Sequence, residues 1–219
     1  MDWSPFFLSL KVAACATALS ILVGVPIAYA LARRRVPGRA AWEGVTLLPL
    51  VLPPTVLGYY LLVALGRRSP LGRAIHALTG GTVVFTWQGA ALAACLVSIP
   101  LLIRTAQAAF ASVEEELLAA ARTMGASEWQ AFRYVLLPLS RRGLIAGVGL
   151  AFARALGDFG ATLMVAGDIP GVTRTMPLAV YDAVYAGDDH TALVFVLLLS
   201  ALCLVFSLFA SFFTARHDA

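Results

Sequence analysis

The sequence SVEEELLAAARTMGASEWQAFRYVLLP, residues 112–138, decides how the rest of the chain is interpreted. Ser112 followed by Glu115 predicts a capping box at the start of one helix. Ser127 followed by Gln130 predicts a second capping box at the start of another helix. We therefore predict two short helices in this polar segment.

Gly125 is expected to join the two helices, because glycine readily adopts the left-handed turn that ends many helices. Pro138 marks the end of the second helix or a bend into a following one. Each helix has one apolar side, formed by Val113, Leu117, Ala120, Ala121 and Met124 in the first and by Trp129, Phe132 and Leu136 in the second. The hairpin is too polar to span a bilayer, so it either lies on a membrane surface or docks against a partner.

The chain around this hairpin is typical of an integral membrane protein. Of its 219 residues, 60% are hydrophobic and 13% are charged, whereas a soluble domain carries about a quarter charged residues. A helix that crosses a bilayer needs about 20 apolar residues, and five windows meet this length: 12–31, 45–65, 83–103, 144–165 and 192–213. We predict a single domain, residues 1–219, with an all-α membrane fold of about five transmembrane helices and the hairpin between the third and fourth.

Basic residues indicate the orientation, because they are enriched in cytoplasmic loops. Ten arginines fall in the loops 32–44 and 104–143 and in the tail: Arg33, Arg34, Arg35, Arg39, Arg104, Arg122, Arg133, Arg141, Arg142 and Arg216. The opposite side holds five basic residues: Lys11, Arg67, Arg68, Arg73 and Arg174. We therefore expect the hairpin and the C-terminus inside, and the N-terminus and residues 66–82 and 166–191 outside, the last with a short helix near 176–186. Since the arginines lie at the ends of apolar windows, a nucleic-acid partner is not expected.

The second window contains Pro53 and Pro54 after Pro49, and proline kinks a helix by removing a backbone donor. The window is therefore either a kinked packing helix or a flexible segment that lines a translocation path. Both interpretations stay open.

The fourth window combines small residues with two charges. A stripe of small residues every four positions predicts close helix packing: Gly143, Gly147, Ala151 and Ala155. Arg154 and Asp158 are one turn apart at membrane depth, where an unpaired charge costs roughly 2.5–3.5 kcal/mol. They form either a self-compensating pair on one helix face or part of a conduction path or its gate, where Gly157 and Gly160 could loosen the helix.

Several kinds of chemistry are excluded by composition. Lys11 is the only lysine, so the phosphate-binding loop G-x-x-x-x-G-K-[ST] cannot occur and any ATP hydrolysis must belong to another polypeptide. Cys15, Cys95 and Cys203 stand in three separate apolar windows, without the spacing of a metal site. We expect no catalytic residues, no cofactor and no metal.

The hairpin resembles the coupling loop of importer-type ABC permeases at Ala120, Ala121, Gly125, Ala126, Phe132, Leu137 and Pro138. The glutamate of that family aligns with Ala119, and the nearest carboxylates, including Glu116, lie a turn upstream. In such families this loop seats in a cleft of a cytoplasmic ATPase. The resemblance therefore favours the docking interpretation over the membrane-surface one.

Two further stretches, 48–68 and 151–184, resemble molybdate ABC-transporter permeases, with sulfate/thiosulfate permeases as the alternative. The resemblance implies a multi-pass protein of a prokaryotic plasma membrane that forms the translocation path by alternating access and imports molybdate and tungstate. Implied partners are a second copy of the permease, two cytoplasmic ATPase subunits and an extracytoplasmic molybdate-binding protein. An ion-driven carrier would instead show paired repeats and several intramembrane ionisable residues. A membrane scaffold would leave the proline and glycine breaks unexplained.

Overall fold

The computed structural model describes residues 2–33 and 37–214, and in these ranges the chain is helical with no strand. The elements in chain order are α1 (Ser4–Arg33), α2 (Arg39–Val51), α3 (Pro54–Leu65), α4 (Pro70–Thr79), α5 (Trp87–Ala111), α6 (Glu115–Thr123), α7 (Glu128–Ala131), the π-helix η1 (Phe132–Leu136), α8 (Leu137–Leu156), α9 (Gly160–Ala166), α10 (Met176–Ala186) and α11 (Asp189–Thr214). Arg34, Arg35 and Arg216, which contribute to the predicted orientation, lie outside the described residues.

Four long stretches are apolar enough to cross a membrane: Ser4–Arg33, Trp87–Ala111, Glu128–Leu156 and Asp189–Phe212. A fifth candidate is the pair α2 and α3, which passes the same test together but is bent by 106°. The predicted all-α membrane fold is confirmed.

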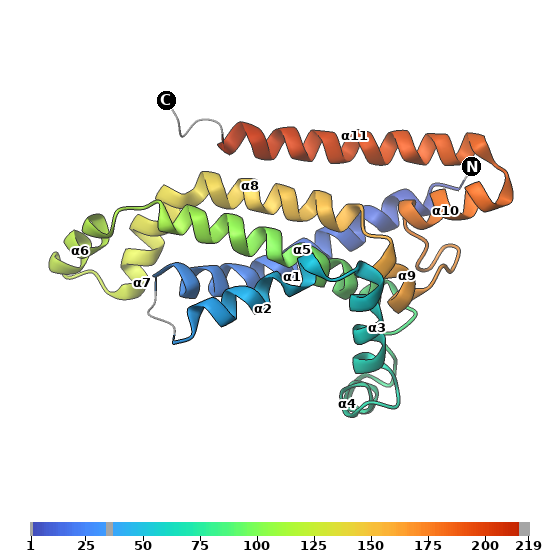
Figure 1. The fold of residues 1–219 in the computed structure, drawn as a ribbon, viewed down its shortest axis with the longest axis horizontal. Coiled ribbons are helices and arrows are strands. Elements are labelled where there is room, and N and C mark those ends of the chain that lie inside the picture. Colours follow the sequence, from blue (N-terminus) through green and yellow to red (C-terminus); the bar gives the residue numbers. More distant parts are fainter. Residues whose placement is uncertain (1, 34–36, 215–219) are drawn as a thin grey trace.

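Figure 1 shows α1, α2, α5 and α8 running side by side, with α11 along one flank of this bundle. The hairpin of α6 and α7 lies at one end of the bundle, and α10 lies at the other end beside the N-terminus. Helix α3 leaves the bundle steeply and leads to α4, while the short helix α9 packs against α3. The bundle therefore places the hairpin at one end and a crossing of two short helices to one side.

The expected single kinked helix in the second window is replaced by two separate helices. α2 ends at Val51, and Leu52 and Pro53 are extended, with ψ of 143° and 136°. Proline disfavours a helical conformation in the residue before it and donates no hydrogen bond itself. Two consecutive prolines therefore break the helix, whereas the isolated Pro49 is accommodated inside α2.

The fourth window was placed too far along the chain. Its span begins at Glu128, runs through α7, η1 and α8, and ends at Leu156. Pro138 does not end a helix, because it directly follows the π-helix η1 and the chain continues as α8. The backbone then leaves the helix at Gly157, and residues 160–166 form the separate helix α9.

The stripe of small residues on α8 packs closely against another helix, as predicted, and that helix is α5. A Cβ atom at Gly143 would lie 2.5 Å from the Cβ of Ala109, and one at Gly147 would lie 3.0 Å from the Cβ of Thr105. Close packing of α5 and α8 therefore depends on both glycines.

The two predicted outside segments each contain a helix. The expected helix near 176–186 is confirmed as α10. Helix α4, within 66–82, was not anticipated, although Ser69 caps it by accepting a hydrogen bond from the backbone of Gly72 at 2.8 Å.

Candidate coupling hairpin and candidate gate

The hairpin is attached to the bundle by its apolar side chains. Val113, Leu118, Ala121 and Leu136 are buried. They belong to one cluster with residues from the adjacent ends of α1 and α5, namely Ala28, Leu31, Ile103, Ala106 and Phe110. The apolar interior of the hairpin is thus continuous with the bundle core.

The first predicted capping box is wrong. Ser112 continues the end of α5, and its hydroxyl donates to the carbonyl of Ala109 at 3.0 Å. Helix α6 begins only at Glu115, after Glu114, and has no side-chain cap. Ser112 and Glu115 therefore belong to different helices.

The second capping box and the glycine turn are present. Ser127 Oγ accepts from the backbone of Gln130 at 3.3 Å, and Gln130 Oε1 accepts from the backbone of Ser127 at 2.8 Å. Gly125 has a φ of +90°, and the Ala126 amide donates back to the carbonyl of Ala121 at 3.0 Å. Gly125 therefore supplies the left-handed conformation that the turn requires.

The predicted apolar faces of the hairpin are only partly buried. Leu117, Ala120 and Met124 are exposed, because Leu118 and Ala121 set the rotation of α6 by packing inward. Met124 is 82% exposed and Trp129 65% exposed.

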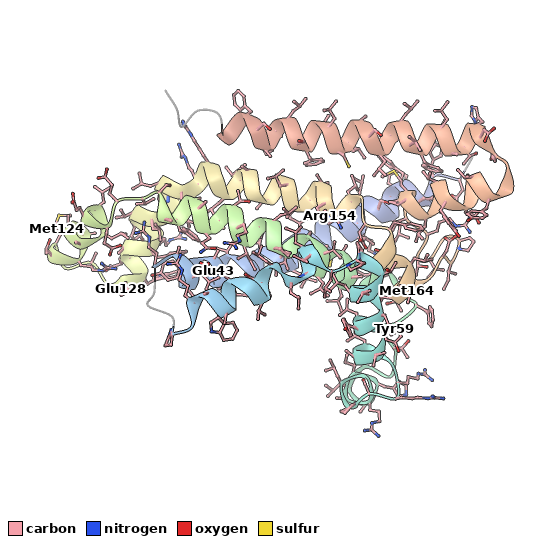
Figure 2. All side chains as sticks on the ribbon, in the orientation of Figure 1. Glu43, Tyr59, Met124, Glu128, Arg154 and Met164 are labelled. Atoms are coloured by element: carbon pink, nitrogen blue, oxygen red, sulfur yellow. The ribbon has the colours of Figure 1, made fainter. Side chains whose placement is uncertain are left out.

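Trp129 stacks on Phe132 with ring centroids 5.6 Å apart. Tyr134 is also exposed, so the hairpin exposes four large apolar side chains: Leu117, Met124, Trp129 and Tyr134. Figure 2 shows Met124 at the tip of the hairpin, with Glu128 nearby.

The residues that resemble a coupling loop divide into two groups. Those that hold the hairpin to the bundle are buried or half-buried: Ala121, Ala126, Phe132 and Leu137. Those on its outer surface are exposed: Glu116, Ala120, Gly125 and Pro138.

The hairpin also contains ion pairs that its sequence did not predict, since its arginines indicated only the orientation in the membrane. Glu115 accepts from Arg33 at 2.8 Å and from Arg122 at 3.0 Å. The hydrogen bond from Arg122, helped by the charge of Arg33, holds the pKa of Glu115 below its ordinary value. Glu115 is therefore ionised at neutral pH.

The helix breaks in the second and fourth windows lie next to each other, because the starts of α3 and α9 are in contact. A Cβ at Gly160 would lie 3.1 Å from Cγ2 of Thr55 and 3.3 Å from the Cβ of Pro54. A Cβ at Gly58 would lie 2.7 Å from the Cβ of Met164. The structure thus brings together Pro54 and Gly160, two of the predicted gate residues.

Figure 2 labels Tyr59 on α3 and Met164 on α9, where the two helices cross. The exposed Pro53 precedes this crossing on the chain. The crossing of α3 and α9 is the candidate gate.

Asp158 has a different principal partner from the one predicted. One carboxylate oxygen accepts from both the backbone and the hydroxyl of Thr162, at 2.9 and 2.8 Å. The other oxygen lies 3.9 Å from Arg154, whose side chain is 30% exposed. Asp158 lies in the break between helices, so the two charges do not share one helix face.

The described ranges contain no group of three or more His, Cys, Asp or Glu side chains arranged to hold a metal ion.

These features define a multi-pass helical membrane protein with an exposed hairpin at one end and broken helices beside the bundle. The profile of the family described as "Binding-protein-dependent transport system inner membrane component" matches residues 20–218. The chain belongs to this family.

Two relatives and one solved structure agree with this assignment. The chain is 41% identical over 215 residues to the Molybdenum transport system permease protein ModB of Escherichia coli strain K12, covering 98% of this chain and 94% of that protein. It is also 41% identical to the Putative molybdenum transport system permease protein YvgM of Bacillus subtilis strain 168, covering 93% and 91%. A methionine ABC transporter, MetNI, in an inward-facing conformation has the same fold, with a TM-score of 0.73, 18% identity and coverage of 96% and 94%.

Proposed function

We propose that this chain is the permease subunit of an ATP-driven importer for molybdate and for the similar dianion tungstate. The proposal rests mainly on 41% identity, over 98% of the chain, to a permease named for molybdenum transport. We propose further that residues 1–219 form one permease domain. In the complete importer, a second copy of this chain, two cytoplasmic ATPase subunits and an extracytoplasmic molybdate-binding protein would join it.

The hairpin is proposed as the contact with the ATPase. Its exposed apolar side chains suit a protein partner, because aromatic and methionine side chains are enriched in the cores of interfaces. In this assignment the hairpin lies in the cytoplasm and the N-terminus lies outside. If intact cells were labelled from outside at a cysteine replacing Ser127, this orientation would be wrong.

The crossing of α3 and α9 is proposed as the gate of the translocation path, with Pro53, Pro54, Arg154, Asp158 and Gly160 as its residues. Short helices that follow breaks can rotate as units, because no continuous backbone hydrogen bonding ties them to α2 and α8. ATP binding would close the ATPase dimer, and the hairpin would transmit that movement to the bundle. The gate would then open alternately outward and inward.

Selection among oxyanions is assigned to the binding protein. Molybdate and sulfate are both tetrahedral dianions with only acceptor oxygens, and Arg154, 3.9 Å from Asp158, is the arginine included in the candidate gate. A path with so few cationic donors offers little basis for separating the two anions.

The experiment is uptake of labelled molybdate by the complete importer, reconstituted in liposomes with its ATPase and binding protein. We expect ATP-dependent uptake that excess unlabelled molybdate suppresses and excess sulfate does not. Equal competition by sulfate would assign the importer to sulfate instead. Failure of the ATPase to co-purify would contradict the role of the hairpin.

A further inference from the structure

Arg33 occupies the last turn of α1 and joins three parts of the molecule. Its side chain is only 11% exposed. One guanidinium nitrogen donates to the carbonyl oxygens of Phe110 and Val113, where α5 ends, and the other donates to Glu115 at 2.8 Å. Carbonyls at a helix C-terminus lack intrahelical partners, so a buried arginine can bind them strongly.

From Glu115 the contacts continue through the hairpin. The second carboxylate oxygen of Glu115 accepts from Arg122 at 3.0 Å. Arg122 in turn donates to both carboxylate oxygens of Glu128, at 2.7 and 3.3 Å. Arg33, Glu115, Arg122 and Glu128 thus form an unbroken ion-pair chain from α1 through α6 to α7.

We propose that this ion-pair chain fixes the orientation of the hairpin on α1, so that a movement imposed on the hairpin is transmitted to the bundle. The inference rests on the proposed contact between hairpin and ATPase. All four residues are positioning residues, because they act on the orientation of the hairpin.

The ion pairs constrain the direction of the contact as well as strengthen it. The apolar contacts of Leu118 and Ala121 are non-directional, so they leave the angle of α6 against α1 undefined. Arginine forks that bind two acceptors, as Arg33 and Arg122 do here, define a plane and an angle. The apolar cluster therefore accounts for attachment, and the ion-pair chain defines the angle at which α6 is held against α1 and α7.

The position of the ion-pair chain also suits the transmission of movement from the hairpin to α1. It runs beside a small cavity of about 80 Å³ whose lining includes Tyr29, Leu118 and Leu136. Packing is thus incomplete between α1 and the hairpin at this point. The ion pairs add contacts between α1 and the hairpin beside this cavity.

The test uses Glu115→Gln, which removes the central charge while keeping the shape of the side chain. The matched control is Glu114→Gln, because Glu114 is the adjacent exposed carboxylate and makes no ion pair within residues 2–33 and 37–214. Each variant is reconstituted with the ATPase and the binding protein, and uptake of labelled molybdate and ATP hydrolysis are measured together. We expect Glu115→Gln to lower the molybdate imported per ATP by about fivefold, with normal yield of the assembled complex and with Glu114→Gln like wild type.

A second measurement follows the hairpin itself. A spin label at Met124→Cys, in a chain with Cys15, Cys95 and Cys203 replaced by alanine, reports the mobility of the hairpin tip. We expect Glu115→Gln to increase this mobility and Glu114→Gln to leave it unchanged.

Unchanged mobility together with an unchanged transport ratio would overturn the inference. If the wild-type complex fails to assemble or to import molybdate, the proposed function fails. The spin-label comparison still tests the ion-pair chain in that case.

Discussion

The crossing of α3 and α9 and the hairpin of α6 and α7 both depend on a glycine, but for opposite reasons. Gly58 lies inside a helix, and a Cβ there would meet the Cβ of Met164 at 2.7 Å and the backbone of Ala161 at 2.9 Å. Gly125 has open space around it but a φ of +90°. The crossing has no room for a side chain at Gly58, whereas the hairpin needs a left-handed backbone conformation at Gly125. Different substitutions should therefore disturb the two regions.

The largest effect is expected from Gly58→Val. The added side chain meets backbone atoms that cannot move aside, and overpacking of this kind costs about 3 kcal/mol. We expect a lower thermal-unfolding temperature of the purified protein and a lower yield. Gly44→Ala is the control, because nothing lies within 4 Å of a Cβ at that helical position. Equal stability of Gly58→Val and wild type would show that α3 and α9 do not pack as described.

The next effect concerns the buried carboxylate beside the crossing. Thr162→Val removes the hydroxyl that donates to Asp158 at 2.8 Å, and a hydrogen bond to a charged group contributes about 1.5–3 kcal/mol. We expect a double-mutant cycle of Asp158→Ala with Thr162→Val to show a larger coupling energy than one of Asp158→Ala with Arg154→Ala. The reason is that Arg154 is half-exposed and 3.9 Å away. A larger coupling to Arg154 would restore the ion pair as the main contact of Asp158.

A smaller effect is expected from Gly125→Val in the hairpin. A left-handed conformation costs a branched residue about 1–2 kcal/mol, whereas asparagine adopts it more readily. We expect Gly125→Val to insert normally and to reduce ATPase association or molybdate uptake, and Gly125→Asn to retain most of both. Normal uptake by Gly125→Val would show that transport does not need the left-handed conformation at this position.

The smallest effect is expected from Ser127→Ala, which removes half of the capping box. Loss of such a cap costs about 1 kcal/mol. We expect faster hydrogen exchange of the α7 amides, measured by mass spectrometry. Ser112→Ala is the control, since the Ser112 hydroxyl donates to Ala109 and caps no helix start. Equal exchange in the two variants would mean that the box does not hold α7.

The sequence was sufficient for features that depend on local chemistry. The apolar windows predicted the membrane fold, Ser127 with Gln130 predicted a cap, and Gly125 predicted a left-handed turn. The stripe that includes Gly143 also predicted close packing against another helix, which in the structure is α5. Each of these follows from residue type and spacing within one segment.

Features that depend on contacts between distant segments could not be obtained this way. Arg33 and Glu115 are 82 positions apart, so nothing local indicates that they pair. The contact of Asp158 with Thr162 is local, four positions along the chain, but it depends on the helix break at Gly157, which the sequence did not predict. The rotation of α6 was also misjudged, because packing against α1 and α5 decides which side of so short a helix is buried.

The π-helix at Phe132–Leu136 sets the rotation of α7 about the axis of α8. Each residue of an α-helix advances the side-chain direction by about 100°, and a π turn accommodates one residue more than an α turn. Removing one residue from this turn would let an uninterrupted α-helix form and would turn α7 by that angle about the axis of α8. Trp129 would then point to a different side while Gly143 still faced α5. The extra residue therefore rotates the side chains of α7 relative to those of α8. A one-residue deletion there should turn the hairpin away from its present direction without unfolding the bundle.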